Sequence, residues 1–466
     1  MLRKILTLTV PMLLVAGFVA VAFQVPQQPP PPQQPPPQQQ QQPPEVMITI
    51  TGGGGAPHYA VPDFLALSGD AETTAAAKTI GQVLWDDLRF ERDLDMIPRD
   101  TYASIPVARS ATDVPFDRWR ELGADGLVIG TVQKVASAMR VEVRLYQVQT
   151  GKVAFSKQYD QPAASPANPR LFAHTASDEI LLQQRNLRGV ARTKIAFDSN
   201  RDAERVGGTI EERQAKEIYM CDYDGANQRR ITVGRTLSIS PDWSPDGRAI
   251  AYTSFARGFP DVFVSLIYQG ILQKPTRGTG QNFLPAYSPE GSRIAFVSNR
   301  DGNDEIYVMN ADGANVRRLT HSPAIDSTPT WSPSGLQVAF TSDRTGAPQI
   351  WVMNADGTDQ RQLTRESYCD RPTWSPAPYN EIAYASRTSP GGFDIKVLDL
   401  ARMQATPITF GEGSNESPAY APNGRHLAFM STRGGGRPQL YTIGRDGRDL
   451  RQITRVGSHF MPNWSH

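Results

Sequence analysis

From residue 192 to the C-terminus, short apolar segments alternate with polar turns in a pattern that repeats about every 44 residues. In each repeat an aromatic residue ends one strand-like segment, and an apolar run begins after the next turn. The aromatic residues are Trp243, Tyr287, Trp331, Trp374, Tyr420 and Trp464. The apolar runs begin at Ile195, Ile250, Ile294, Val338, Ile382 and Leu427. Six copies of each segment predict six structural repeats built from short strands.

Two further strand-like segments complete the repeat. One reads "EIYVMNADG" or "QIWVMNADG", the other reads "RRLT" or "RQLT", and an Asp-Gly turn joins them. Asp-Gly turns favour tight hairpins because both residues tolerate positive φ angles. Four short strands in a unit of this length are typical of one β-propeller blade. The sequence therefore predicts a six-bladed β-propeller over residues 190–466.

The two ends of the repeat region are incomplete in complementary ways. The apolar run at Ile195 has no aromatic segment before it, and the aromatic segment at Trp464 has no apolar run after it. If these two segments pair, both open sheet edges become hydrogen-bonded. We therefore expect the final segment "FMPNWSH" to complete the first blade, so that the C-terminal strand closes the propeller.

Residues 45–189 mix helical and strand periods. The segment "TTAAAKTIGQVLWDDLRF" places Ala76, Ile80, Val83, Leu84 and Leu88 on one stripe at helical spacing. The segment "RVEVRLYQ" alternates apolar and charged residues, as a half-exposed strand does, and "PRLFAHTASDEILLQQ" predicts a second helix. The predicted fold class is thus an α/β N-terminal domain followed by an all-β six-bladed β-propeller.

The first 44 residues precede both predicted domains. A basic start, an apolar run and an Ala-Val-Ala site predict a signal peptide over residues 1–22, and in a bacterium export to the periplasm. An uncleaved anchor is the alternative, because roughly 20 apolar residues can cross a bilayer. Residues 23–44 are predicted to be a disordered linker, since Pro26 to Pro44 contains only Pro and Gln and favours an extended chain. Docking of this tract on a proline-binding partner is the second interpretation.

Charge and reactive residues exclude several functions. Lys and Arg number 48 against 47 for Asp and Glu, so no net field attracts nucleic acid. No nucleophile, base and stabilising group occur in a recognisable catalytic order, and the propeller histidines lack metal-ligand spacing. We expect no enzymatic activity and no cofactor, and nothing in the sequence supports a cation in the channel. Cys221 and Cys369 fall in different blades, which argues against a disulfide between them.

One loop varies strongly between repeats whose strands are alike. It precedes each aromatic strand and reads "SIS", "QNFL", "IDST", "CDR", "SNES" and "SHFM". In the propeller register all six copies lie at one mouth of the central channel. Apolar residues among polar ones are typical of a binding surface, and plain solvated loops are the alternative. On this argument alone Asp370, Arg371, Glu416 and His459 are candidate partner contacts.

The order of segments resembles that of the TolB family, the periplasmic propeller proteins of the Tol-Pal system. The resemblance rests on "SPDWSPDG", on "SRIAFVSNRDGNDEIYVMNADGANVRRLT" and above all on the junction "LFAHTASDEIL…GVARTKIAFDSNRD". It covers nearly everything after the Pro/Gln tract. It implies a periplasmic, monomeric adaptor without catalytic activity.

The resemblance also implies partners and contact residues. Members of this family bind the peptidoglycan-associated lipoprotein Pal at the propeller mouth, which supports outer-membrane constriction in cell division and envelope integrity. The matching positions in this chain are Ser240, Gln281, Phe283, Leu284, Ser327 and Thr328. The family also binds the inner-membrane protein TolA through its mature N-terminus. Here only Phe23, Gln24 and Val25 precede the Pro/Gln tract, which puts that second contact in doubt.

A different class of function remains as the alternative. A secreted β-propeller can bind glycans or accompany a hydrolase. Such a protein needs a catalytic cluster in the channel or an attached catalytic domain, and the sequence shows neither.

Overall fold

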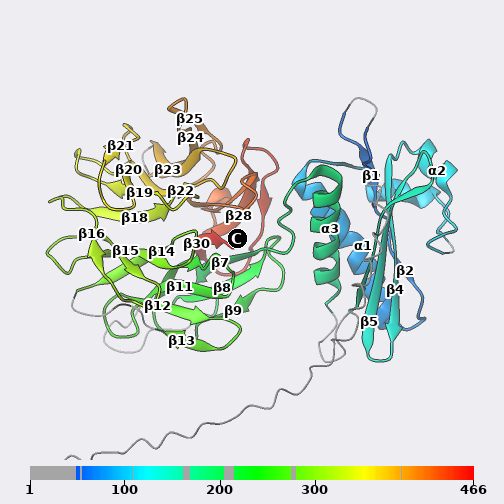
Figure 1. The fold of residues 1–466 in the computed structure, drawn as a ribbon, viewed down its shortest axis with the longest axis horizontal. Helices are drawn as coiled ribbons and strands as arrows, with labels where there is room; N and C mark the ends of the chain where they lie inside the picture. Colours follow the sequence, from blue (N-terminus) through cyan, green and yellow to red (C-terminus); the bar gives the residue numbers. More distant parts are fainter. Residues whose placement is uncertain are drawn as a thin grey trace, which may run out of the picture. The chain divides into compact units, whose positions relative to one another are not determined.

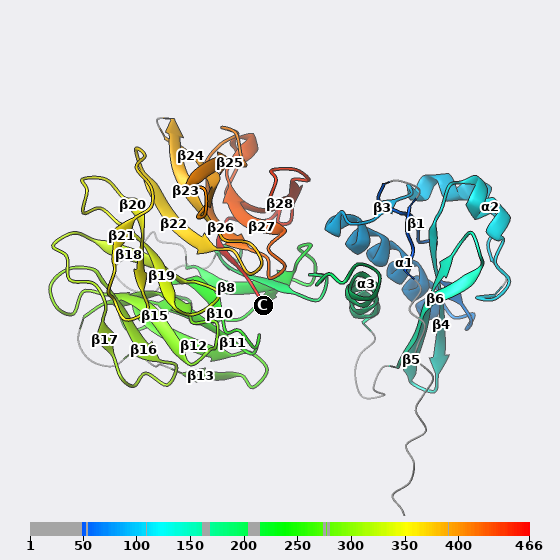
Figure 2. The ribbon, with the colours of Figure 1, turned by 45° about the horizontal axis from the view of Figure 1, so that its top comes forward.

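The computed structural model describes residues 49–52, 55–108, 110–160, 168–203, 215–273, 276, 280–389 and 391–466 (Figure 1). The predicted signal peptide (residues 1–22) and Pro/Gln linker (residues 23–44) lie outside these ranges. Within the described ranges, no helix is long and apolar enough to cross a membrane. They form an α/β region and a six-bladed β-propeller, which confirms the predicted fold class (Figure 2).

The α/β region contains a mixed sheet in the order β3-β1-β4-β5-β6, with β2 beside β4. Its strands are β1 (His58–Ala60), β2 (Leu65–Ala66), β3 (Asp95–Met96), β4 (Gly126–Val135), β5 (Ala138–Gln147) and β6 (Lys152–Asp160). Its helices are α1 (Ala71–Glu91), α2 (Phe116–Glu121) and α3 (Pro169–Arg185), with a 3-10 turn η1 (Arg99–Ser104). The β1 strand pairs in parallel with β3 and β4, and β4, β5 and β6 form an antiparallel meander.

The two faces of this sheet carry separate cores. Val128 and Val132 of β4 pack with the apolar residues of α1 and α3. Leu127 and Ile129 point to the other face and pack with Trp119 of α2. Side chains alternate along a strand, so neighbouring residues of β4 serve different cores. As a result η1 and α2, which are short, cover the second face.

The long helix α1 follows the predicted apolar stripe. Ile80, Leu84 and Leu88 are fully buried on this stripe. Asp70 precedes the helix, and its Oδ1 accepts a hydrogen bond from the Thr73 backbone N at 2.9 Å. A side-chain cap of this kind satisfies an amide that the first turn leaves without a helical partner.

Six four-stranded antiparallel sheets form the propeller. Blade 1 contains β10 (Ser238–Trp243), β11 (Ala249–Ser254), β12 (Asp261–Leu266) and β13 (Ile271–Gln273); blade 2 contains β14 (Asn282–Tyr287), β15 (Arg293–Ser298), β16 (Glu305–Asn310) and β17 (Arg317–Arg318); blade 3 contains β18 (Asp326–Trp331), β19 (Gln337–Ser342), β20 (Gln349–Asn354) and β21 (Arg361–Gln362). Blade 4 contains β22 (Cys369–Trp374), β23 (Glu381–Ser389), β24 (Gly392–Asp399) and β25 (Gln404–Pro407); blade 5 contains β26 (Asn415–Tyr420), β27 (His426–Ser431), the 3-10 turn η2 (Arg433–Gly435), β28 (Gln439–Gly444) and β29 (Arg451–Gln452). Blade 6 contains β30 (His459–Trp464), β7 (Lys194–Ser199), β8 (Glu217–Asp222) and β9 (Arg229–Arg230).

Blade 6 joins the two ends of the repeat region. The C-terminal strand β30 pairs with β7, with Trp464 opposite Ile195 and His459 opposite Ser199. Trp464 is 3% exposed, and its Nε1 donates to Thr193 Oγ1 at 2.7 Å. The predicted closure by the final strand is thus confirmed, and it places β7 between β30 and β8 instead of at an open edge of the sheet.

Asn463 of β30 connects the closing strand to blade 1. Its Oδ1 accepts from the Trp243 backbone N at 2.9 Å, and its Nδ2 donates to Asp242 Oδ1 at 2.8 Å. The other carboxylate oxygen of Asp242 accepts from the Tyr287 backbone N of blade 2 at 2.6 Å. Burial raises the pKa of Asp242 to about 7, while these two hydrogen bonds oppose the rise. The Asn463 amide therefore joins the closing strand of blade 6 to blade 1, and through Asp242 to blade 2.

A repeated side-chain cluster supports the first residue of the inner strands. In blades 2, 3 and 5 an arginine donates from Nη2 to the side chain of that residue, and from Nε to a serine that ends the second strand. The pairs are Arg300 with Asn282 at 2.7 Å, Arg344 with Asp326 at 2.7 Å and Arg433 with Asn415 at 3.0 Å. The serine contacts come from Ser298, Ser342 and Ser431. The recurring arginines therefore act as hydrogen-bond donors within these blades.

In blade 6 His459 takes the position of those asparagine and aspartate side chains. It is fully buried, its ring packs edge-on against Phe197 at 5.1 Å, and its Nε2 donates to Val456 O at 2.7 Å. Burial, with a contribution from the Arg201 charge, lowers the pKa of His459 to about 4. The sequence placed His459 among the partner contacts at the mouth. In this structure His459 is a neutral packing residue, and its fully buried side chain presents no surface at the mouth.

The end of α1 is bound to the propeller. Glu91 is 3% exposed; its carboxylate accepts from the Val190 backbone N at 2.8 Å and pairs with Arg425. Burial raises the pKa of Glu91 to about 7, although Arg425 opposes the rise. Beside it, Phe90 stacks on His426 with ring centroids 4.1 Å apart. The Glu91–Arg425 ion pair and the stacked Phe90 and His426 rings together tie the α/β region to blade 5.

The closure by Asn463 gives a prediction for stability. Asn463→Ala removes a donor to the buried Asp242 and an acceptor for the Trp243 backbone N. Alanine occupies the same register position in blades 2 and 5, as Ala286 and Ala419, so its shape is compatible. We expect the free energy of unfolding in urea to fall by about 1–3 kcal/mol. Thr330→Ala at the same register position of blade 3 is the control, with an expected loss below about 1 kcal/mol. Equal losses in the two variants would contradict the role of Asn463.

The buried histidine gives a prediction for pH dependence. The pKa of His459 is about 4 in the folded chain and about 6.5 in an unfolded one, so the unfolded state binds more protons between these values. Stability therefore falls as the pH falls through this window, by about 1.5–2 kcal/mol from pH 7 to pH 5.

His459→Asn introduces the side chain that blades 2 and 5 use, and should remove this part of the acid destabilisation. Urea unfolding at pH 7 and pH 5 measures it. His321→Asn, at an exposed position, should keep the wild-type difference. An unchanged pH dependence in His459→Asn would refute the assignment.

Candidate partner-binding site at the channel mouth

The inner strand of every blade contains the same bulge. Its third residue has a positive φ angle and is followed by proline, and the strand register shifts at this point. The residues are Ser240 (55°), Leu284 (53°), Thr328 (48°), Arg371 (56°), Ser417 (54°) and Met461 (49°). A left-handed conformation costs a residue other than glycine roughly 1–2 kcal/mol. Proline lacks an N–H group, so it breaks the ladder without leaving a donor without an acceptor.

These six residues form what we term the channel ring. Together with the prolines that follow them, they line a cavity of about 120 Å³ at one end of the central channel. The residues one position earlier are partly exposed in all six blades. We term this second set the rim ring: Ile239, Phe283, Ser327, Asp370, Glu416 and Phe460. The two rings present a surface to which every blade contributes two neighbouring side chains.

Most of the predicted contact residues lie in these two rings. Ser240, Leu284, Thr328 and Arg371 belong to the channel ring, and Phe283, Ser327, Asp370 and Glu416 belong to the rim ring. Gln281 lies one residue before β14, where it is exposed and its backbone N donates to Asn299 Oδ1 at 2.9 Å. Whether any of these residues contacts a partner stays a prediction.

Four members of the rings were not among the candidate contacts: Ile239 and Ser417 were not singled out, and Phe460 and Met461 were noted only as apolar residues of the mouth. Ile239, Ser417, Phe460 and Met461 occupy ring positions in blades 1, 5 and 6. The proline that follows the third residue of each inner strand fixes the register in all six repeats. Counting back from this proline identifies both rings, and it places His459 one position too early to belong to either.

Asp370 joins two neighbouring blades at the rim. Its Oδ1 accepts from Thr341 Oγ1 of blade 3 at 2.9 Å and from the Arg371 backbone N at 2.7 Å. Thr328 Oγ1 lies 3.4 Å from the same oxygen. Hydrogen bonds to a carboxylate are stronger than those between neutral groups. The charge of Asp370 is therefore held in one place at the mouth.

Arg371 reaches across the opening of the channel. Its Nη1 lies 2.6 Å from Met461 Sδ, which joins blade 4 to blade 6. The Arg371 side chain remains 27% exposed. A guanidinium group beside a polarisable thioether gives the centre of the mouth a positive charge on an apolar support.

The blade 6 side of the mouth carries a buried ion pair. Asp198 is fully buried and its Oδ2 lies 3.1 Å from Lys216 Nζ. Burial raises the pKa of Asp198, and the Lys216 charge opposes the rise. The same ammonium lies 3.4 Å from the centroid of the Phe460 ring. Lys216 therefore covers one face of this rim residue.

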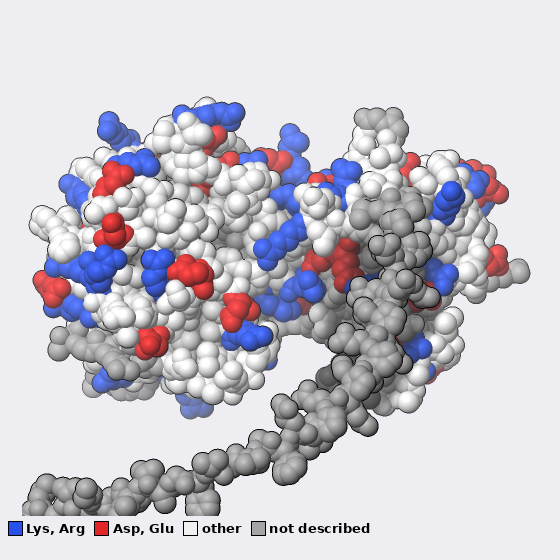
Figure 3. All heavy atoms as spheres, viewed as in Figure 1, with Lys and Arg blue, Asp and Glu red and all other residues white. Residues whose placement is uncertain are grey.

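The side chains at the mouth are of the kinds that recognise a binding partner. Apolar side chains of the rings stand among separate positive and negative groups, as in the centre of protein interfaces. Among the described residues no group of three or more His, Cys, Asp and Glu could hold a metal ion. On the face of the molecule shown in Figure 3, Lys and Arg groups alternate with Asp and Glu over the propeller. No broad area of one sign on that face favours a polyanionic ligand.

Comparison with known proteins identifies relatives of both regions. The family model of the TolB beta propeller domain matches residues 182–466, and that of the TolB amino-terminal domain matches residues 46–154. The Tol-Pal system protein TolB of Desulfosudis oleivorans is 34% identical over 208 residues, which cover 44% of this chain and 44% of that protein. The protein of the same name from Anaeromyxobacter dehalogenans is 36% identical over 199 residues, which cover 42% and 43%. The matched segments thus span less than half the length of these curated relatives.

A solved structure extends the similarity over most of the described fold. The crystal structure of TolB from Acinetobacter baumannii superposes with a TM-score of 0.73 at 25% sequence identity, and covers 90% of this chain and 98% of that one. The propeller family model alone covers more than half of the sequence. The chain therefore belongs to the TolB family.

Proposed function

We propose that this protein is a non-enzymatic periplasmic adaptor of the Tol-Pal system, which binds the lipoprotein Pal at the channel mouth. The observation that carries the proposal is the pair of rings, because six blades present twelve adjacent and varied side chains on one surface. The assignment to the Tol-Pal system rests on the relatives named Tol-Pal system protein TolB. In this role the protein supports outer-membrane constriction in cell division and envelope integrity.

The composition of the rings suits a protein partner. Apolar area comes from Phe283, Leu284, Phe460 and Met461, and Arg371 lines the same cavity as Leu284 and Met461. Aromatic residues, methionine and arginine are enriched at the centres of protein interfaces. The fixed carboxylate of Asp370 restricts how a partner can dock, because the partner must place a hydrogen-bond donor or a cation opposite it. We expect a partner loop to enter the shallow cavity at the centre.

Among the described residues at the mouth, we find no nucleophile or general base with an activating partner. A general base or nucleophile needs a second group that activates it within hydrogen-bond distance. His459 is fully buried, and the hydroxyl and amide groups around Asp370 are donors to it. For glycan binding, an exposed aromatic face is the usual platform, yet Lys216 covers one face of Phe460. Both alternatives have less support than protein binding.

The TolA contact is a separate proposal. The resemblance assigns it to the mature N-terminus, which lies outside the described residues. The proposal for Pal rests on the channel mouth alone, so the two contacts are proposed and tested separately for this chain.

Calorimetric titration tests the proposed partner. The chain from residue 23 onward is titrated with the soluble domain of Pal from the same organism, and we expect saturable one-to-one binding. Ser327→Arg introduces a long charged side chain at a partly exposed rim position. It should weaken binding at least about tenfold, a loss of about 1.4 kcal/mol, without changing the melting temperature.

Leu336→Arg is the matched control, because Leu336 is 70% exposed in the turn between β18 and β19 of the same blade. It should leave the affinity unchanged. Absence of binding at high protein concentration would refute Pal as the partner. Equal affinities for Ser327→Arg and the wild type would refute the mouth as the site.

A further inference from the structure

Blade 4 departs from the other blades where its second strand approaches the channel mouth. In blades 2, 3 and 5 an arginine two residues after the serine that ends the second strand bonds back to the first residue of the inner strand. In blade 4 that first residue is Cys369, whose thiol is only a weak acceptor. The blade 4 arginine, Arg387, directly follows the equivalent serine, Ser386. Arg387 thus stands one position earlier than the arginines of those blades.

An extended strand pairing holds Arg387 at the surface of blade 4. The ladder of β23 and β24 continues past the pair of Ser386 and Asp394, which ends the equivalent ladder in the other blades, and places Arg387 opposite Phe393. Ser386 is fully buried, whereas Arg387 is exposed. Successive residues of a strand point to opposite faces of the sheet, so the Arg387 side chain is directed outward.

Two aromatic rings support the Arg387 guanidinium group. Its Cζ lies 4.6 Å from the centroid of the Tyr368 ring and 5.3 Å from that of the Phe393 ring. The two rings pack edge to face with centroids 5.4 Å apart. Contact with ring faces attracts the cation and leaves the N–H groups in its plane free to donate. We term Tyr368, Arg387 and Phe393 the blade 4 cluster.

The blade 4 cluster adjoins the channel mouth. Tyr368 directly precedes β22 and lies two residues before Asp370 of the rim ring. Burial and the Asp370 charge raise the pKa of Tyr368, while the Arg387 and Arg371 charges oppose the rise. The cluster and the charged residues of the mouth therefore form one continuous surface on blade 4.

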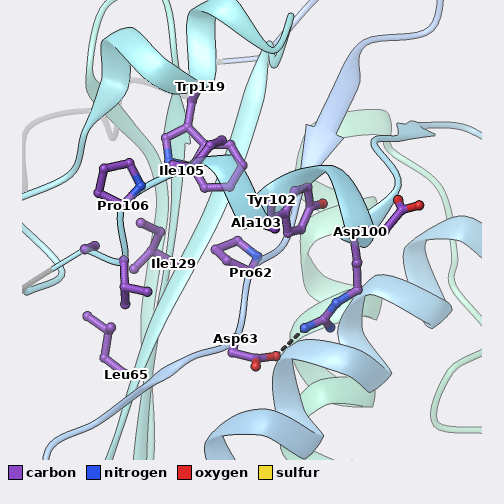
Figure 4. Close-up of a pocket in the computed structure, with 13 residues that line it drawn as sticks. Pro62, Asp63, Leu65, Asp100, Tyr102, Ala103, Ile105, Pro106, Trp119 and Ile129 are labelled. Carbon is purple, nitrogen blue, oxygen red and sulfur yellow. Dashed lines mark hydrogen bonds and ion pairs between the residues drawn. The ribbon is translucent and has the colours of Figure 1, made fainter.

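Arginines in two other hollows of the molecule are already paired with carboxylates. The α/β region has a cavity of about 360 Å³ with a mainly apolar lining, where Arg99 pairs with Asp63 (Figure 4). In the crevice where the end of α1 meets blade 5, Arg425 pairs with Glu91. The Arg387 side chain has no hydrogen bond or ion pair with a described residue. Its donors are therefore available to a ligand from outside the chain.

A carboxylate is the anion that suits the blade 4 cluster. The planar fork of a guanidinium group matches carboxylate and phosphate oxygens in pairs. The negative charges of Asp370 and Glu416 also act on Tyr368, and such charges repel a doubly charged phosphate more than a singly charged carboxylate. The two rings add apolar area beside the cation, and arginine with aromatic residues is typical of the residues that dominate protein interfaces. The chemistry therefore favours an acidic side chain of a protein.

We propose that the blade 4 cluster binds an acidic side chain of the protein that docks at the channel mouth. This contact rests on the proposed function, because it needs a partner seated on the two rings. Asp370 requires a donor or a cation, and Arg387 requires a carboxylate. The partner must therefore present both groups in one order along blade 4. The cluster thereby determines how the partner is oriented on the six-bladed ring.

Calorimetric titration of the chain from residue 23 onward with the soluble domain of Pal tests the contact. Arg387→Gln removes the charge and should weaken binding at least about fivefold, because the partner's carboxylate then loses its cation. Arg387→Lys keeps the charge without the planar fork, so its loss should be smaller, about two- to threefold. Both variants should keep the wild-type melting temperature, because the side chain is exposed.

Arg257→Gln is the matched control. Arg257 lies in the equivalent loop of blade 1, where its side chain is 54% exposed and its Cζ lies 5.4 Å from the centroid of the Phe259 ring. Its replacement should leave the affinity unchanged. Absence of binding by the wild-type chain would refute the proposed function and this contact with it. Binding by the wild-type chain with equal affinity in Arg387→Gln would overturn this contact alone.

A double-mutant cycle tests the chemistry of the contact. Each Asp and Glu of the Pal domain is replaced singly by Asn or Gln, and each variant is titrated against the wild-type chain and against Arg387→Gln. We expect one acidic position whose replacement weakens binding to the wild-type chain at least about threefold and leaves binding to Arg387→Gln unchanged. A loss of affinity in Arg387→Gln that couples to no acidic position would overturn the proposal, because Arg387 would then act through packing within blade 4.

Discussion

The structure depends on the pairing of β30 with β7, which joins residues 459–464 to the strand that begins the propeller. Each of the other blades is one continuous segment of the chain, and only this blade requires its two ends to meet. Asn463 stabilises the closing strand against blade 1, because it accepts a hydrogen bond from the Trp243 backbone N and donates one to the Asp242 carboxylate. Because Asp242 is buried, loss of its hydrogen bond to Asn463 would leave its carboxylate without that partner and lower the stability of the closed ring.

Closure also determines where the candidate site lies. Each inner strand carries one left-handed residue before proline, and a single bulge of this kind would be only a local irregularity. In the closed ring the six bulges turn toward one opening, so that their side chains line a common cavity. Contacts between blades, such as Thr341 with Asp370, offset part of the backbone strain. The mouth is therefore a property of the assembled ring.

Repetition made much of this architecture predictable. Trp464 without a following apolar run, and Ile195 without a preceding aromatic strand, predict both the number of blades and the closure. The same repetition predicts the location of the mouth. His459, a predicted contact, is fully buried in the structure, because a difference of one residue along a strand separates a buried position from a partly exposed one.

Contacts between distant parts of the chain were beyond sequence reasoning. Glu91 looks like an ordinary helix-end carboxylate, yet it lies buried against Arg425, more than 300 residues away. Trp119 and Tyr102 look like core residues of a small domain, and part of that core is in fact an open groove. A single sequence contains no signal for such pairs, because they depend on how separate elements come together.

Hydrogen exchange with and without the soluble domain of Pal tests the central claim most directly. If the closed ring presents one binding surface, protection should appear in the inner strands of several blades around residues 239–240, 283–284, 327–328, 370–371, 416–417 and 460–461. The turns at the opposite ends of those strands should exchange as before. Protection confined to those turns or to the α/β region, with the two rings unchanged, would contradict the account.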